Sequence, residues 1–177
     1  MDGEPPVTLQ IKPNVLTESR LVLHFISDNY SNREWIPESD SDKHRDIFSQ
    51  ELAKFTLLEK VDFALFLEVV AMMLPFGFRQ LVGLLARPVV GHFVSDQRGV
   101  YQLMEEALSE ELPWFAGKKI GIADFCFSFP MDMAAQRGYF EAEKYPKVAE
   151  WHQRIHDRPA YKRALEKGGP YDLVKFT

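Results

Sequence analysis

The stretch "KKIGIADFCFSFP" (residues 118–130) decides the fold expected for this chain. Gly121 stands where a helix can begin, and Asp124 follows three residues later. A carboxylate at the third helical position accepts hydrogen bonds from free backbone N–H groups, and its charge favours the positive end of the helix. Ile120 and Phe125 occupy the positions of a hydrophobic staple. The stretch therefore predicts the start of a buried helix, with Asp124 as a structural cap and without a catalytic role.

Helical patterns continue on both sides of this stretch. From Asp42 onward, apolar residues recur at helical spacing almost to the end of the chain. Residues 75–77, Pro-Phe-Gly, should break or kink one helix, and Pro88 is a candidate break in the next. Proline in a first helical turn marks two further helices, near Pro146 and Pro159. The sequence therefore predicts a bundle of about five helices from Asp42 onward.

The beginning of the chain predicts a different kind of structure. Residues 7–16 alternate as strands do and contain turn-forming residues at 12–14, so we expect a β-hairpin. A short helix should follow, capped by Thr17 or Glu18, and the polar residues 32–41 are expected to form a linker. Because a lone hairpin is marginal in water, it indicates a partner sheet or helix.

Composition excludes several classes of function. The 177-residue chain has a net charge of −5, which argues against nucleic acid or an anionic membrane as the main partner. Its single cysteine, Cys126, cannot form an intrachain disulfide and is consistent with a reducing compartment. The start "MDGEPP" lacks the features of a secretory signal, and the apolar run at 69–78 is too short to span a membrane. We expect a cytoplasmic protein.

Other patterns that carry chemistry in some proteins favour ordinary structural roles here. His152 and His156 are four residues apart, a spacing that can hold a metal, but Gln153 replaces the glutamate of the zincin pattern. We interpret these histidines as part of a solvated helical face and expect no metal. Cys126 lies between two phenylalanines and is interpreted as a buried, inert thiol. Ser19 lacks the context of a hydrolase nucleophile.

Two segments carry a resemblance to a known family. The stretches "PWFAGKKIGIADFCFSFPMDMAAQRG" (113–138) and "YPKVAEWHQRIHDRPAYKRALEKGGP" (145–170) resemble the C-terminal helical domain of cytosolic glutathione transferases of the fungal and bacterial branch. The order, spacing and aromatic positions match. The resemblance implies a mainly α fold, with an all-helical domain at 42–177 and a linker at 32–41. Residues 1–31 would be a remnant of the thioredoxin-like N-terminal domain, a partial α/β segment of one hairpin and one helix.

The start of the chain resembles the glutathione site of the same family. In "EPPVTLQIKPNVLTES" (4–19), Pro6 takes the place of the family's cis-proline, and the backbone of Val7 would pair with the cysteinyl part of glutathione. Glu18 would pair with the α-ammonium group, while Ser19 and the N–H groups of the helix start would hold the α-carboxylate. Taken alone, the segment around Glu18 favours a plain helix cap.

The resemblance also implies an activity. Family members conjugate glutathione, their co-substrate, to apolar electrophiles, and some are homodimers. Phe66, Met73 and Phe76 are the candidates for lining a hydrophobic substrate pocket, although such a stripe is usually core. The family's thiol-activating Tyr, Ser or Cys has no counterpart in this sequence, so no catalytic residue is assigned. The alternative is a catalytically impaired binding or interaction protein, or a truncated gene product.

Overall fold

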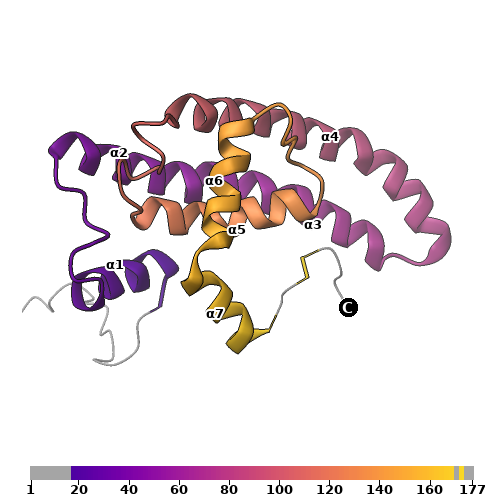
Figure 1. Ribbon diagram of the computed structural model, residues 1–177. Helices are drawn as coiled ribbons and strands as arrows, with labels where there is room; N and C mark the ends of the chain where they lie inside the picture. Colours follow the sequence, from indigo (N-terminus) through magenta and orange to yellow (C-terminus); the bar gives the residue numbers. More distant parts are fainter. Residues whose placement is uncertain (1–16, 170–171, 174–177) are drawn as a thin grey trace, which may run out of the picture.

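The computed structural model describes residues 17–169 and 172–173 of the chain. Within these residues the regular elements are all helices (Figure 1), which confirms the mainly α expectation. They are α1 (Ser19–Tyr30), α2 (Asp40–Leu52), η1 (Ala53–Leu58), α3 (Glu59–Met73), α4 (Phe76–Ala107), α5 (Ile122–Gln136), α6 (Pro146–Asp157) and α7 (Pro159–Gly168). The predicted hairpin lies outside the described residues. Of the described helices, none has the length and apolar character needed to cross a membrane.

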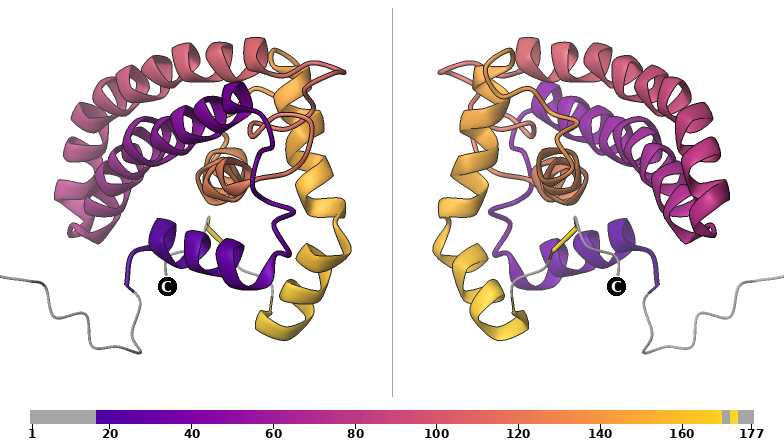
Figure 2. Two further views of the ribbon diagram at one scale, coloured as in Figure 1. Left: turned by 90° about the vertical axis from the view of Figure 1, so that its left-hand side faces the viewer. Right: turned by 90° about the vertical axis from the view of Figure 1, so that its right-hand side faces the viewer.

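Helix α5 runs through the centre of the fold. In Figure 2, α5 is seen end-on, with α2, η1, α3 and α4 on one side, α6 and α7 on another and α1 beneath. Its side chains Phe127 and Met131 are fully buried, as are Leu57 of η1, Met104 of α4 and Trp151 of α6. Aromatic packing adds to this core, since the Phe115 and Phe127 ring centroids are 4.4 Å apart. The core is therefore built around the helix that the stretch 118–130 begins.

The chain from α2 to α3 is one continuous helical run with a π-helical segment, η1, in its middle. Ala53 and Leu57 of η1 are fully buried in the core. The run ends at Met73, where Leu74 and Pro75 adopt extended backbone, and α4 then begins. The predicted interruption at residues 75–77 is thus confirmed at Pro75, whereas no pattern in the sequence predicted the π-helical segment.

Helix α4 does not break at Pro88, so that expectation is wrong. Proline in a helix interior lacks one hydrogen bond and costs about 3 kcal/mol. On the C-terminal side of Pro88, Phe93 and Val94 pack against the core, and the Phe93 ring lies 4.4 Å from that of Phe63 on α3. Both side chains are partly buried, so their contacts with the core offset part of the loss at the proline. Figure 2 shows α4 curving along α3 as an unbroken helix.

Helix α5 begins as the sequence predicts, with Asp124 as its cap. The Asp124 side chain is fully buried and accepts hydrogen bonds from the backbone N–H groups of Gly121 (2.9 Å), Phe115 (2.9 Å) and Ala116 (3.4 Å). It also accepts one from the indole Nε1–H of Trp151, at 2.8 Å. Burial raises the pKa of Asp124 to about 6, against the opposing effect of these donors.

Glycine at position 121 has a steric reason. A Cβ atom there would lie 2.4 Å from the Cβ of Ala116, far inside van der Waals contact. The preceding loop therefore approaches the helix start so closely that only glycine fits. This contact explains why the hydroxyl-bearing cap residues Ser and Thr are absent from this helix start.

A second buried carboxylate reaches the same helix start from α2. Asp46 accepts a hydrogen bond from the backbone N–H of Ala123 (2.9 Å) and another from Nε2 of Gln50 (2.7 Å). Burial raises the pKa of Asp46 above its ordinary value. The Gln50 side-chain oxygen lies 3.1 Å from Nε2 of His24, on α1. Side-chain contacts therefore connect the start of α5 through α2 to α1.

Replacing Asp124 should destabilise the protein strongly. Asp124→Ala leaves four buried donors without their acceptor, and each such donor costs about 1–3 kcal/mol, so we expect a loss of at least about 4 kcal/mol. Urea unfolding followed by circular dichroism measures this loss. The exposed Asp157, replaced by alanine, serves as the control and should leave the free energy of unfolding unchanged. A loss below about 1 kcal/mol for Asp124→Ala would contradict the role assigned to this carboxylate.

Candidate functional site

The residue before α1, Glu18, has a strained backbone. Its φ of 71° and ψ of 114° lie in a region that residues with a side chain rarely adopt. Such a conformation costs on the order of 1–3 kcal/mol and is concentrated at ligand clamps and active sites. Glu18 occupies the N-cap position of α1, one of the two positions expected, but its side chain makes no capping hydrogen bond. With this unusual φ, the Glu18 side chain does not hydrogen-bond to the N–H groups of the first turn of α1.

The first turn of α1 carries backbone donors that the helix does not use. The first backbone hydrogen bond runs from Val22 N–H to the Glu18 carbonyl oxygen, at 3.0 Å. Within the described part of the chain, no acceptor is found for the N–H groups of Ser19, Arg20 and Leu21. Ser19 is exposed, so its hydroxyl is accessible to a ligand. Free N–H groups at the positive end of a helix are suited to an anion such as a carboxylate.

Charged side chains surround this helix start. The Glu18 carboxylate is 70% exposed and lies 3.2 Å from the Lys54 ammonium group on η1. Arg20 forms an ion pair with Glu51 at the end of α2. Exposed pairs of this kind contribute little to stability, about 0–1 kcal/mol, so a ligand can replace them at small expense. The start of α1 thus offers an exposed carboxylate next to unused N–H donors, a combination that suits a zwitterionic amino-acid group.

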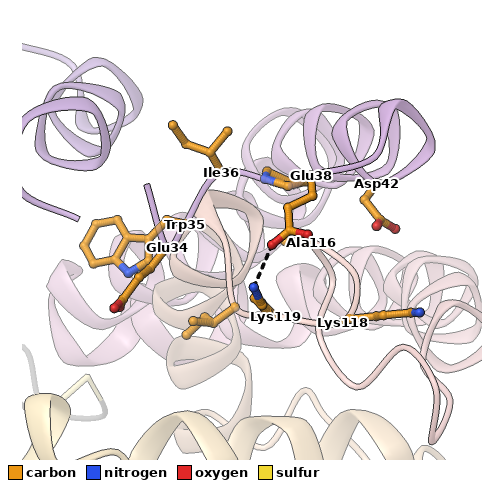
Figure 3. Close-up of a pocket in the computed structure, with 10 residues that line it drawn as sticks. Glu34, Trp35, Ile36, Glu38, Asp42, Ala116, Lys118 and Lys119 are labelled. Carbon is orange, nitrogen blue, oxygen red and sulfur yellow. Dashed lines mark hydrogen bonds and ion pairs between the residues drawn. The ribbon is translucent and has the colours of Figure 1, made fainter. Parts of the chain in front are cut away.

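A small cavity lies elsewhere, between the segment 34–38 and the loop 116–120. Figure 3 shows Trp35 and Ile36 on one side and Lys119 on the other, with Lys119 bonded to Glu38 at 2.8 Å. Its volume is about 90 Å³, whereas ligand pockets usually measure about 300–1,000 Å³. The cavity is too small for a tripeptide, and we assign it no ligand.

The candidate residues for a hydrophobic pocket lie on a surface of the molecule. Phe66 is 60% exposed and Met73 is 80% exposed, both on α3. On α4, Phe78 and Leu84 are also exposed. The side chain of Phe76 is outside the described part of the structure, as are Pro6 and Val7. The described residues thus show an exposed apolar surface on α3 and α4, and the pocket role of Phe66, Met73 and Phe76 stays a prediction.

The thiol of Cys126 has the properties expected of an inert cysteine. Burial raises its pKa to about 11, and it lies on α5 packed against the core. Since the thiolate is the reactive form, a thiol with this pKa is almost wholly protonated and a poor nucleophile at neutral pH.

The interpretation of His152 and His156 as a solvated face is wrong. Both Nε2 atoms contact one carboxylate oxygen, Oδ1 of Asp132 on α5, at 2.6 Å and 2.7 Å. The side chain of His152 is only 14% exposed and that of Asp132 only 2%. The spacing of the histidines was visible in the sequence, but their partner comes from another helix. No pattern in the sequence predicted that Asp132 of α5 would contact this face of α6.

Comparison with known proteins agrees with this architecture. Residues 94–159 match the family described as "Glutathione S-transferase, C-terminal domain". This range contains the start of α5 with its Asp124 cap and the whole of α6. This part of the chain is therefore similar to the C-terminal domain of glutathione S-transferases. The resemblance stated for the residues around Asp124 and Trp151 is therefore confirmed.

Individual relatives match part of the chain. The protein is 38% identical over 74 residues to the disulfide-bond oxidoreductase YfcG of Escherichia coli, covering 42% of this chain and 33% of that protein. It is 30% identical over 99 residues to glutathione S-transferase 3 of Schizosaccharomyces pombe, covering 51% of this chain and 40% of that protein. The matched segments thus span well under half the length of these relatives.

Solved structures share the fold. Ure2p5 of Phanerochaete chrysosporium, cocrystallized with 1-(S-glutathionyl)-2,4-dinitrobenzene, superposes with a TM-score of 0.68 at 21% identity. The match covers 86% of this chain and 68% of that one. A glutathione S-transferase of Actinobacillus pleuropneumoniae gives a TM-score of 0.63 at 23% identity, covering 95% of this chain and 71% of the other. These likenesses show the fold of the described helices.

The strain at Glu18 predicts an unusual response to glycine. Glycine adopts positive φ without a steric penalty, whereas alanine retains that penalty, so Glu18→Gly should be more stable than Glu18→Ala by about 1 kcal/mol. Both variants lose the pair with Lys54, and their difference isolates the backbone. Urea unfolding of the two variants measures it. In the interior of α1, Ser27→Gly and Ser27→Ala provide the control, where alanine should be the more stable. If the alanine variant is more stable than the glycine variant at position 18 as well as at position 27, the backbone of Glu18 is not strained.

Proposed function

We propose that the protein binds glutathione at the start of α1, through its γ-glutamyl end. The observation that carries the proposal is Glu18, a residue with strained backbone and a largely exposed carboxylate beside N–H donors for which the described residues offer no acceptor. The match of residues 94–159 to the C-terminal domain of glutathione S-transferases supports it. The bound glutathione conjugate of Ure2p5, a protein of the same fold, supports it as well.

The proposed arrangement uses both charges of the γ-glutamyl group. Its α-ammonium group would replace Lys54 as the partner of the Glu18 carboxylate, a charge-assisted hydrogen bond. Its α-carboxylate would accept from the Ser19 hydroxyl and from the first-turn N–H groups of α1. The backbone of Val7, after Pro6, is proposed to pair with the cysteinyl part of glutathione.

We further propose that the protein is a glutathione transferase that conjugates glutathione to an apolar electrophile. In that reaction the thiolate sulfur attacks an electrophilic carbon, a C–S bond forms, and the bond to the leaving group, such as a halide, breaks. The thiol proton passes to solvent or to a base. No residue of this chain is assigned the task of thiol activation. Phe66, Met73 and Phe76 are the proposed contacts of the apolar substrate.

The remaining proposals concern the setting of the protein. The division into a thioredoxin-like remnant at 1–31, a linker at 32–41 and a helical domain at 42–177 is proposed on the family resemblance. We also propose a cytoplasmic location and a homodimer. The exposed apolar side chains of α4, among them Phe78, Leu84 and Val89, support the homodimer because a second copy would bury them.

Calorimetric titration with glutathione tests the binding proposal. We expect saturable binding in the micromolar range, weakened at least tenfold, about 1.4 kcal/mol, in Glu18→Gln because the ammonium group loses its charged partner. Ser19→Ala should weaken binding less. Glu143→Gln, at an exposed glutamate before α6, is the matched control and should bind as the unaltered protein does. Cysteinylglycine, which lacks the γ-glutamyl group, should not bind.

Turnover is measured separately, with glutathione and a chlorodinitrobenzene, whose conjugate matches the ligand of Ure2p5. A rate above that of the spontaneous reaction supports the transferase. Binding at Glu18 without turnover favours the alternative, a catalytically impaired glutathione-binding protein. Folded protein that neither binds nor turns over glutathione, or that binds it equally well in Glu18→Gln, contradicts the proposed site.

A further inference from the structure

A cluster of metal-ligating side chains lies where α5, α6 and α7 meet, and it shares no residue with the proposed glutathione site. Asp132 projects from α5, and His152 and His156 project from one face of α6. Each of these three side chains offers one ligand atom, and the three atoms lie within 4.8 Å of one another. Two helices thus bring two imidazoles and one carboxylate together around a single point.

The arrangement of these three side chains is unusual because both imidazoles contact the same carboxylate oxygen. The Nε2 atoms of His152 and His156 lie 2.6 Å and 2.7 Å from Oδ1 of Asp132. This oxygen belongs to a carboxylate that is only 2% exposed. A buried charge of this kind needs several donors or a cation. Two imidazole nitrogens and one carboxylate oxygen form a donor set that Zn²⁺ prefers in proteins.

Neighbouring rings fix the orientation of the histidines. The ring of His156 stacks on that of Tyr161 of α7, with centroids 4.6 Å apart and planes at 16°. The centroids of His152 and His156 are 4.4 Å apart. The Tyr161 hydroxyl lies 3.3 Å from Oδ2 of Asp132 and donates to it. Hydrogen bonds to a ligating carboxylate, and packing that locks a ligating ring, are the outer contacts typical of metal sites.

The geometry points to a Zn²⁺ site formed by Oδ1 of Asp132, Nε2 of His152 and Nε2 of His156. We propose that a water molecule supplies the fourth ligand, since three protein ligands leave one tetrahedral position open. The site would connect α5 to α6 and, through Tyr161, to α7.

The distances from Oδ1 of Asp132 to the two imidazole nitrogens need only a small adjustment to accept the ion. Zinc bonds of about 2.0–2.2 Å at tetrahedral angles place ligand atoms about 3.3 Å apart. The two N–O distances must therefore lengthen by about 0.6–0.7 Å, which rotation of the side chains can supply. Each imidazole must carry its proton on Nδ1 when the metal binds, so that Nε2 has a lone pair for the metal. The side chains of His152 and His156 are 14% and 34% exposed, so solvent is available to exchange these protons.

Titration of the full chain, purified without a histidine tag, with zinc chloride alone tests the proposal. Calorimetry should show one Zn²⁺ per chain, and the thermal unfolding midpoint should rise with the metal concentration. Co²⁺ in place of Zn²⁺ should give the visible absorption bands of a tetrahedral complex. Both His152→Gln and His156→Gln should weaken Zn²⁺ binding at least tenfold and remove the cobalt bands. His92→Gln, at an exposed histidine of α4, is the matched control and should change neither.

A variant that stays folded is needed so that loss of Zn²⁺ binding is not confused with unfolding. His156 has the more exposed side chain of the two histidines, so His156→Gln should retain the fold, which far-ultraviolet circular dichroism checks. The proposal is overturned if the folded wild-type protein shows no saturable Zn²⁺ binding in the micromolar range. It is also overturned if folded His156→Gln binds Zn²⁺ as tightly as the wild type. In either case the cluster is a hydrogen-bonded contact between helices and not a metal site.

Discussion

The buried carboxylate of Asp124 is the contact on which the arrangement of the helices depends. A charge without exposed surface is tolerated only where donors surround it, and here the loop at 115–116, the start of α5 and the indole of Trp151 supply them. One side chain thus connects the loop at 115–116, the start of α5 and the more distant helix α6. Because α5 passes through the centre of the fold, the position of its first turn determines how the surrounding helices pack on it.

The same helix start is connected to the proposed glutathione site. Asp46 of α2 accepts from the first turn of α5, and Gln50, which donates to Asp46, contacts His24 of α1. The position of α1 is therefore tied to the core by polar side chains in addition to apolar packing. The strained residue Glu18 lies at the beginning of α1, and the contact of His24 with Gln50 holds this helix against the core. A strained conformation can persist only where the surrounding structure determines it in this way.

Local patterns in the sequence were sufficient for those features that depend on neighbouring residues. The spacing of Gly121 and Asp124 predicted the capped start of α5, and Pro146 and Pro159 marked the starts of α6 and α7, because helix starts are determined within one turn. Features that depend on tertiary contact were missed. Helix α4 continues through Pro88 because of side chains buried against α3, and Asp132 meets His152 from another helix. Backbone strain at Glu18 also leaves no trace in composition or spacing.

The contact between Asp124 and Trp151 tests the account most directly, through a double-mutant cycle with Asp124→Asn and Trp151→Phe. Urea unfolding of the wild type, both single variants and the double variant gives the coupling energy. Because the indole N–H donates to a fully buried carboxylate, we expect a coupling of about 1–3 kcal/mol. Losses that add within about 0.5 kcal/mol would show that the two side chains act independently, and would contradict the role of Asp124 as the junction between α5 and α6.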